Sequence, residues 1–197
     1  MNHDLSGKTI AMLATDGVEQ QELEEPREAL QKAGATVHVV SVHGGSIRAW
    51  NHRDWGDEIA VDRTLDEVSA EDYDGLVVPG GVMSPDALRT HPGAVSLVRE
   101  FDQAEKPMAS LCHGPWMMVE ADVVNGRRLT SWPSLRTDLV HAGAQWEDSE
   151  VVVDCGVVTS RGPDDLPAFC ARMVEEMAEG RHPRHRSGSS DQARPQG

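Results

Sequence analysis

Short apolar runs alternate with amphipathic segments along the chain. Apolar runs of this length are typical of strands buried on both faces of a sheet. Between the first two runs, residues 19–33 predict a helix that ends at Gly34, with Pro26 either early in it or kinking it. A strand joined to the next by one helix favours a parallel sheet. The apolar runs lie at residues 8–14, 36–42, 75–79 and 107–111.

In the second half of the chain, apolar runs and amphipathic segments alternate in the same way, and the last predicted helix has the clearest periodicity. From Leu166 to Met177, apolar residues recur at the spacing of one helical face, and Gly180 ends the pattern. Residues 44–57 lack periodicity and predict a long loop or hairpin. We therefore predict an α/β fold with a single doubly wound, flavodoxin-like, mostly parallel sheet between helices. The remaining predicted elements are helices at 93–104, 116–121 and 134–141 and a strand pair at 151–153 and 157–160.

The 197 residues suit one compact domain. We predict an N-terminal tail at 1–7, an α/β domain at 8–180 and a disordered tail at 181–197. The last of these is rich in Arg, Ser, Gly and Pro and has no apolar anchor.

The charge and the cysteine content limit the binding partners and the cellular compartment that we expect for this protein. The net charge of −15 disfavours nucleic acid and anionic membranes as partners. Three cysteines form no CxxC pair, the start lacks a signal-peptide pattern, and no apolar stretch approaches ~20 residues, so we expect a cytoplasmic protein. The nine histidines show no HxxxH or HExxH pattern, and we expect no metal and no cofactor.

One segment indicates nucleophilic chemistry. A predicted strand runs directly into Cys112, followed by His113, Gly114, Pro115 and a helix. A cysteine at such a turn is exposed at the sheet edge, and the helix N-terminus favours its thiolate. The alternative is a buried structural cysteine. Cys155, in a turn, and Cys170, on an apolar helix face, are interpreted as structural.

Five spaced motifs then resemble the PfpI-like branch of the DJ-1/PfpI superfamily, which includes PfpI endopeptidases and YhbO-type deglycase-like proteins. The resemblance extends from about Lys8 to Glu179, in order and without large gaps. A mild departure is Ser84, where the family usually has Asn. The matching segments are TDGVEQQEL at 15–23, VPGG at 78–81 with SPDALR at 84–89, ASLCHGPW at 109–116, LTSWPS at 129–134 and TSRGPDDLPAF at 159–169.

The resemblance implies a role for each catalytic residue. Cys112 is the nucleophile at a nucleophile elbow, and Glu19 is the acid that hydrogen-bonds its sulfur, protonated because two adjacent anions are costly. His113 is the general base. Asp86 orients this histidine across a subunit interface, which implies a dimer or hexamer. The backbone N–H groups of Gly81 and His113 are the oxyanion donors.

Taken alone, some of these residues have simpler interpretations. Glu19 is also an ordinary first-turn helix acid, and Asp86 is a common cap after Ser84-Pro85. The segment from Trp50 to Trp55 either packs on a neighbouring subunit or forms a lid over the pocket.

A class I glutamine amidotransferase also uses an elbow cysteine, but it needs a later His-x-Glu. None of His141, His182 and His185 begins that motif, so we reject this function. The resemblance favours a cysteine-dependent, cofactor-free enzyme for reactive carbonyls, with glyoxalase III-like or deglycase-like activity in stress protection. Two alternatives stay open, an intracellular cysteine peptidase and a non-enzymatic redox sensor or chaperone-like protein that uses Cys112.

Overall fold

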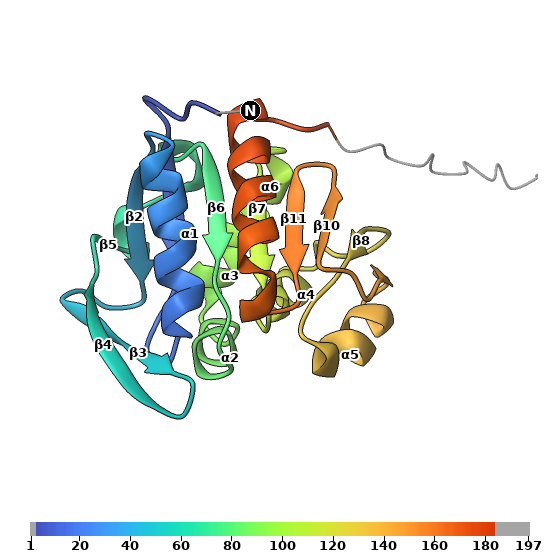
Figure 1. Ribbon diagram of the computed structural model, residues 1–197, viewed down its shortest axis with the longest axis horizontal. Coiled ribbons are helices and arrows are strands. Elements are labelled where there is room, and N and C mark those ends of the chain that lie inside the picture. The colour runs from blue at the N-terminus through green and yellow to red at the C-terminus, as the bar shows by residue number, and fades with distance from the viewer. Residues whose placement is uncertain (1–2, 184–197) are drawn as a thin grey trace, which may run out of the picture.

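The computed structural model describes residues 3–183 and is built on a seven-stranded sheet (Figure 1). Neighbouring strands in the sheet are parallel, except that β10 runs antiparallel to β11 at one edge. The sheet order is β10-β11-β7-β6-β1-β2-β5, with bounds Val151–Asp154, Val157–Ser160, Met108–Leu111, Gly75–Val78, Thr9–Leu13, Thr36–Ser41 and Arg63–Thr64.

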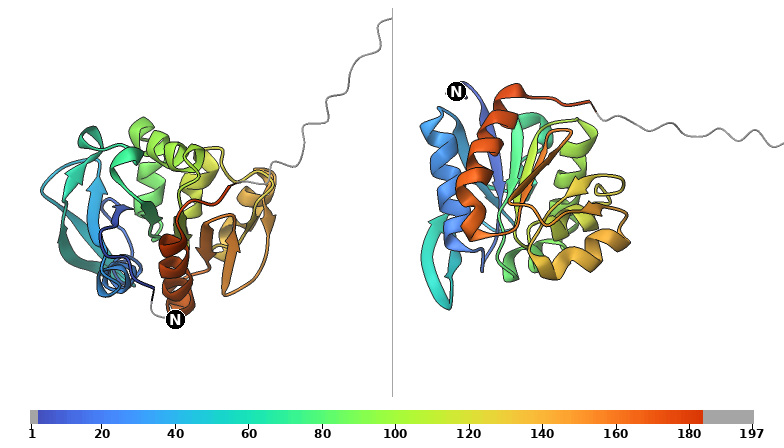
Figure 2. Two further views of the ribbon diagram at one scale, coloured as in Figure 1. Left: turned by 90° about the horizontal axis from the view of Figure 1, so that it is seen from above. Right: turned by 45° about the vertical axis from the view of Figure 1, so that its right-hand side comes forward.

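Helices cover both faces of this sheet (Figure 2). On one face α1 (Gln20–Lys32) packs beside α6 (Leu166–Glu179), and on the other α3 (Pro92–Gln103) packs beside α4 (Pro115–Glu120). Each face has its own apolar cluster, centred on Phe169 on the first side and on Phe101 on the second. This arrangement confirms the predicted doubly wound fold.

Smaller elements surround the sheet at the end where the parallel strands finish. The segment predicted as a loop or hairpin is a hairpin, formed by β3 (Ser46–Asn51) and β4 (Asp54–Ala60). The short helix α2 (Met83–Leu88) has no counterpart in the sequence prediction. The helix α5 (Arg136–His141) lies at the same end, whereas β8 (Arg128–Leu129) pairs with β9 (Gln145–Trp146) beside β10 (Figure 1).

The N-terminal segment packs against the domain. Leu5, inside the segment predicted as an N-terminal tail, is fully buried, and its N–H donates to the carbonyl of Ala33. Of the predicted C-terminal tail, residues 184–197 lie outside the described residues. Over residues 3–183, no helix is long and apolar enough to cross a membrane.

Strands β6 and β7 are buried at every position, and both carry glycine-rich turns at their carboxyl ends. Gly114 precedes α4 and has ordinary helical backbone angles, which any residue can adopt. Glycine is needed here because there is no space for a side chain. A Cβ at this position would lie 2.4 Å from both the Val78 carbonyl oxygen and Ser110 Oγ. The first turn of α4 therefore fits only if residue 114 has no side chain.

We predict that Gly114→Ala lowers the free energy of unfolding by about 1–3 kcal/mol, because the added methyl group must displace backbone. Gly93→Ala is the matched control. Its Cβ would meet nothing closer than 3.4 Å and it lies in α3, so we expect it to be neutral or slightly stabilising. Urea unfolding of both variants tests this, and equal stabilities would contradict it.

Candidate active site

Cys112 forms a strained turn directly after β7. Its φ of 57° lies in the left-handed region, where non-glycine residues are uncommon. Two backbone hydrogen bonds fix the turn: the Cys112 N–H donates to the Ser160 carbonyl at 3.1 Å, and the Trp132 N–H donates to the Cys112 carbonyl at 3.0 Å. The chain thus holds the thiol at the carboxyl edge of the sheet, as predicted for a nucleophile elbow.

The acid beside this thiol is Glu22, in the first turn of α1. Its carboxyl group lies against the Cys112 sulfur and the backbone N–H groups of Gly80 and Gly81. The side chain is fully buried. Among the described residues, no donor makes a well-aligned hydrogen bond to either carboxyl oxygen. Burial and, to a smaller extent, the nearby charge of Glu19 raise the pKa of Glu22 to about 8. Glu22 is therefore a neutral carboxylic acid at pH 7.

Glu22 and Cys112 titrate as one coupled pair. Burial raises the pKa of the Cys112 thiol, and a negative charge on Glu22 would raise it further, whereas the N–H groups of Gly81 and His113 lower it. A proton held on Glu22 removes the repulsion and provides an O–H that can donate to the sulfur. The arrangement thus favours a thiolate beside a protonated acid over two adjacent anions.

His113 supplies a base next to the sulfur. Its Nδ1 lies 3.2 Å from Cys112 Sγ, and its Nε2 lies 3.4 Å from Ser134 Oγ. The ring packs edge-on against Trp116 and stacks on Trp132. Burial lowers the pKa of His113, so the imidazole is neutral near pH 7 and able to accept a proton.

A cavity of about 650 Å³ opens in front of the thiol. Its lining is mainly apolar, with acidic and imidazole groups concentrated around the sulfur and on the side of the β3–β4 hairpin. Such a volume suits a small molecule. The cavity is lined by Glu19, Glu22, Trp50, His52, Gly81, Val82, Met83, Cys112, His113, Trp132 and Pro163.

The β3–β4 hairpin is attached to the start of α1 by polar contacts. The Gln20 side chain bonds Asp57 twice, donating to its carboxylate at 2.9 Å and accepting from its backbone N–H at 3.0 Å. The Trp50 N–H donates to the Val18 carbonyl at 2.7 Å. Trp50 therefore lines the pocket of its own chain, as expected if this segment is a lid. Trp55 does not line the pocket, and 43% of its surface is exposed.

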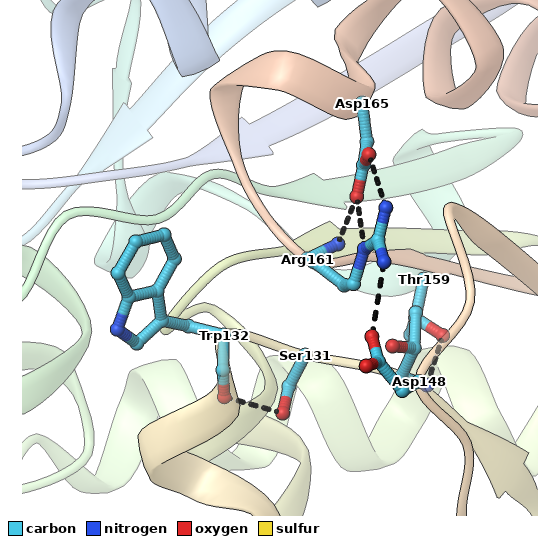
Figure 3. Close-up of polar contacts among 7 residues, drawn as sticks. Ser131, Trp132, Asp148, Thr159, Arg161 and Asp165 are labelled. Carbon is cyan, nitrogen blue, oxygen red and sulfur yellow. Dashed lines mark hydrogen bonds and ion pairs between the residues drawn. The ribbon is translucent and has the colours of Figure 1, made fainter.

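The wall around Trp132 is braced by the two C-terminal motifs (Figure 3). Arg161 makes a bidentate pair with Asp165 and a further bond to Asp148 at 2.9 Å. The Thr130 N–H donates to Thr159 Oγ1 at 2.9 Å. The Thr130–Thr159 bond ties the segment 129–134 to β11, and the bond from the Trp132 N–H to the Cys112 carbonyl holds Trp132 beside the elbow.

Comparison with known proteins agrees with this geometry. A model of the DJ-1/PfpI family matches residues 8–176. The chain belongs to the DJ-1/PfpI family. Several similar proteins are named as deglycases. Protein/nucleic acid deglycase 2 of Escherichia coli is 40% identical over 82% of this chain and 93% of its own length, and a deglycase of Pyrococcus horikoshii is 38% identical over 84% of this chain and 97% of its own length.

The crystal structure of Drosophila melanogaster DJ-1beta is also similar. It has a TM-score of 0.79 and 28% identity, and the match covers 87% of this chain and 90% of that one. The names of the relatives confirm the predicted PfpI-like branch and support an enzyme of the DJ-1/PfpI type.

The geometry corrects one predicted residue. Glu19 was expected to contact the Cys112 sulfur, but Glu22 occupies that place. Glu19 precedes α1 and points to the cavity, where its Oε1 accepts from the His52 N–H at 3.4 Å. The helical phase explains the difference: Glu22, Pro26 and Leu30, spaced by four, form the buried face of α1. A carboxyl group on an apolar stripe was the signal that sequence reasoning missed.

Two other predicted roles depend on more than this chain shows. Asp86 lies exposed in the first turn of α2 rather than as its cap, and its role across an interface stays a prediction. The N–H groups of Gly81 and His113 lie at the sulfur, as an oxyanion hole would require, and their role also stays a prediction.

Among the described residues, one group has metal-ligand spacing, formed by Glu176, Glu179 and His182. These side chains already pair with one another, His182 Nε2 lying 3.2 Å from Glu176, and Arg172 adds a further pairing charge. The group is accounted for as an ion-pair cluster at the end of α6.

Burial of Glu22 predicts a pH-dependent stability. The folded chain keeps this proton up to about pH 8, whereas the unfolded chain loses it near the ordinary glutamate pKa of 4.5. The folded state then binds more protons between these values, so its free energy of unfolding falls as pH rises through this window. Glu22→Gln should lose the share of this decline that belongs to Glu22, on the order of a few kcal/mol. A weaker decline should remain, because the pKa values of Glu19 and Glu176 are also raised in the folded chain.

Urea unfolding at pH 5 and at pH 7.5 measures this slope. Glu25→Gln, an exposed acid on the same helix, is the matched control and should keep the native slope. A native slope in Glu22→Gln would show that Glu22 is ionised in the folded protein.

Proposed function

We propose that this protein is a cysteine-dependent, cofactor-free enzyme that converts reactive carbonyls such as 2-oxoaldehydes, with methylglyoxal as the model substrate. The observation that carries the proposal is the placement of Cys112 between a neutral buried acid, Glu22, and a neutral imidazole, His113. Once His113 takes its proton, the Cys112 sulfur is a strong nucleophile toward aldehydes.

The reaction begins with addition of the Cys112 sulfur to the aldehyde carbon, C1. His113 takes the thiol proton, and the N–H groups of Gly81 and His113 face the oxyanion that forms on the former carbonyl. His113 then returns the proton to this oxyanion, which gives a neutral hemithioacetal and a neutral imidazole. Transfer of the C1 proton to C2 then gives a thioester of a 2-hydroxy acid, and water hydrolyses it and frees the thiol.

This sequence is an internal redox reaction. The aldehyde carbon is oxidised to the acid level while the adjacent ketone is reduced to an alcohol, and one water is consumed. No external oxidant or reductant is needed, which is why the proposal includes no cofactor.

The shape of the cavity favours a small carbonyl over a polypeptide. Its volume of about 650 Å³ holds a small molecule, and Trp50, Trp132 and Met83 line it with apolar surface. The same attack on a carbonyl adduct would support deglycase-like activity, which the names of two relatives attribute to those proteins. A role in protection against carbonyl stress follows from this chemistry. We place the enzyme in the cytoplasm, since Cys112, Cys155 and Cys170 are all free thiols.

The native protein should form lactate from methylglyoxal, and Cys112→Ser should lose at least ~100-fold in kcat because the nucleophile is absent. Cys155→Ser is the matched control. It replaces a thiol in the β10–β11 turn, so it should retain native activity. Chiral chromatography or a lactate-coupled assay measures the product.

A fluorogenic peptide panel and a peroxide titration belong in the same experiment. Cysteine-dependent peptide cleavage without lactate formation would replace the proposal with a peptidase. Oxidation of Cys112 to a sulfinate with no turnover of either substrate would replace it with a redox sensor.

We further propose that the enzyme self-associates as a dimer or hexamer, with Asp86 of one subunit orienting His113 of another. Asp86 is exposed on α2 beside the pocket residues Val82 and Met83, which are 53% and 40% exposed. An exposed apolar rim of this kind suits a subunit interface. Asp86 therefore lies on the surface that we propose contacts His113 of a neighbouring subunit.

Mixing variants tests this sharing of residues. Asp86→Ala and Cys112→Ser should each be nearly inactive, but a mixed dimer holds one site with every residue intact. Refolding the two variants together should recover about a quarter of native activity, as random pairing predicts. No recovery in mixtures shown by mass spectrometry to contain both chains would exclude Asp86 from a shared site.

A further inference from the structure

Glu19 is a buried carboxyl group that lies near the catalytic cysteine but does not contact its sulfur. Its residue is only 9% exposed, yet its side chain lines the cavity. Oε1 accepts a long hydrogen bond from the His52 N–H, and Oε2 accepts none from the residues that the structure describes. A nearly buried acid with a free oxygen facing a cavity is placed to meet a ligand.

The backbone of Glu19 is held next to the oxyanion turn. Its N–H donates to the Gly80 carbonyl at 3.3 Å, and a Cβ on Gly81 would lie 2.6 Å from this same nitrogen. On its other side, Glu19 forms an isolated parallel bridge with Trp50 of the hairpin. The residue is therefore fixed between the turn that faces the sulfur and the hairpin that lines the cavity.

The proposed reaction requires two separate proton transfers. His113, at 3.2 Å from the sulfur, is placed to accept the thiol proton, and Glu22 must stay protonated to stabilise the thiolate. The transfer between C1 and C2 needs another group, one that faces the cavity without contacting the sulfur. Of the carboxyl groups that line the cavity, Glu19 is the one left for this step.

We propose that Glu19 is the proton shuttle of the cavity, acting on the substrate carbons next to the carbon that Cys112 attacks. This inference rests on the proposed function. The Glu19 carboxylate takes the C1 proton of the hemithioacetal. The C–H electrons form a C1–C2 double bond while the π electrons of the C2 carbonyl move onto its oxygen, which gives an enediolate. The C1 hydroxyl proton passes to the C2 oxygen, the carbonyl forms again at C1, and the Glu19 carboxylic acid returns its proton to C2, which leaves the thioester of the 2-hydroxy acid. Glu19 ends in its starting state.

The surroundings of Glu19 suit such a base. Burial raises the pKa of Glu19, which makes its carboxylate a stronger base than an exposed one, while the His52 N–H and charge oppose this shift. Because Glu22 next to it is neutral, Glu19 can carry a negative charge without facing a second carboxylate.

Glu19→Gln separates the shuttle from the nucleophile. In this variant, alkylation of Cys112 by iodoacetamide and the reversible methylglyoxal adduct seen by mass spectrometry should stay within about twofold of native. Formation of lactate should fall in kcat by about 100-fold or more with little change in KM, the usual effect of removing a general acid–base. Glu19→Asp, which keeps a carboxyl group, should recover part of this loss. Glu25→Gln is the matched control and should behave as native.

The outcomes distinguish this inference from the function on which it rests. Native kcat in Glu19→Gln, with an active native enzyme, overturns the shuttle and leaves the proposed function in place. Slower alkylation of Cys112 in both Glu19 variants overturns it as well, because Glu19 would then act on the thiol. Adduct formation without lactate in the native protein overturns the proposed function and the shuttle together.

Discussion

The contact between the Glu22 carboxyl group and the Cys112 sulfur is the constraint around which the site is built. Two groups that each form anions are buried side by side, and only one negative charge is tolerated there. The proton that Glu22 keeps removes the repulsion that would otherwise oppose ionisation of the Cys112 thiol. The left-handed turn at Cys112 and the absence of a side chain at Gly80, where a Cβ would lie 2.2 Å from Glu22 Oε2, bring the two groups into contact.

The rest of the fold supplies the positions that this contact requires. Strand β7 ends at the sheet edge between β6 and β11, whose carboxyl ends provide the Gly80-Gly81 turn and the Ser160 carbonyl. Helix α1 presents Glu22 from one face of the sheet, while α4 begins immediately after the elbow on the other. The hairpin and the braced segment at Trp132 then enclose a cavity in which the thiol meets small molecules.

Glu19 and Glu22 illustrate why two acids one turn apart have different chemistry. Both belong to the same sequence motif and differ by three positions. Glu22 faces the sheet with Pro26 and Leu30, so water is excluded and the acid stays neutral. Glu19 precedes the helix and faces the cavity, where the hairpin brings His52 to it from 33 residues further along the chain.

The main strands and helices of the doubly wound sheet and the elbow at Cys112 are predictable from the sequence alone, because periodicity and turn residues are local properties. The short elements α2, β5, β8 and β9 are not. The sequence also placed His113 beside the nucleophile, since the two are adjacent. Which glutamate reaches the sulfur was decided only by the tertiary structure. That choice depends on the rotation of α1 against the sheet, and so on the packing of Leu23, Pro26 and Leu30, which a motif does not record. The same holds for Trp50, whose place in the cavity follows from contacts between distant segments.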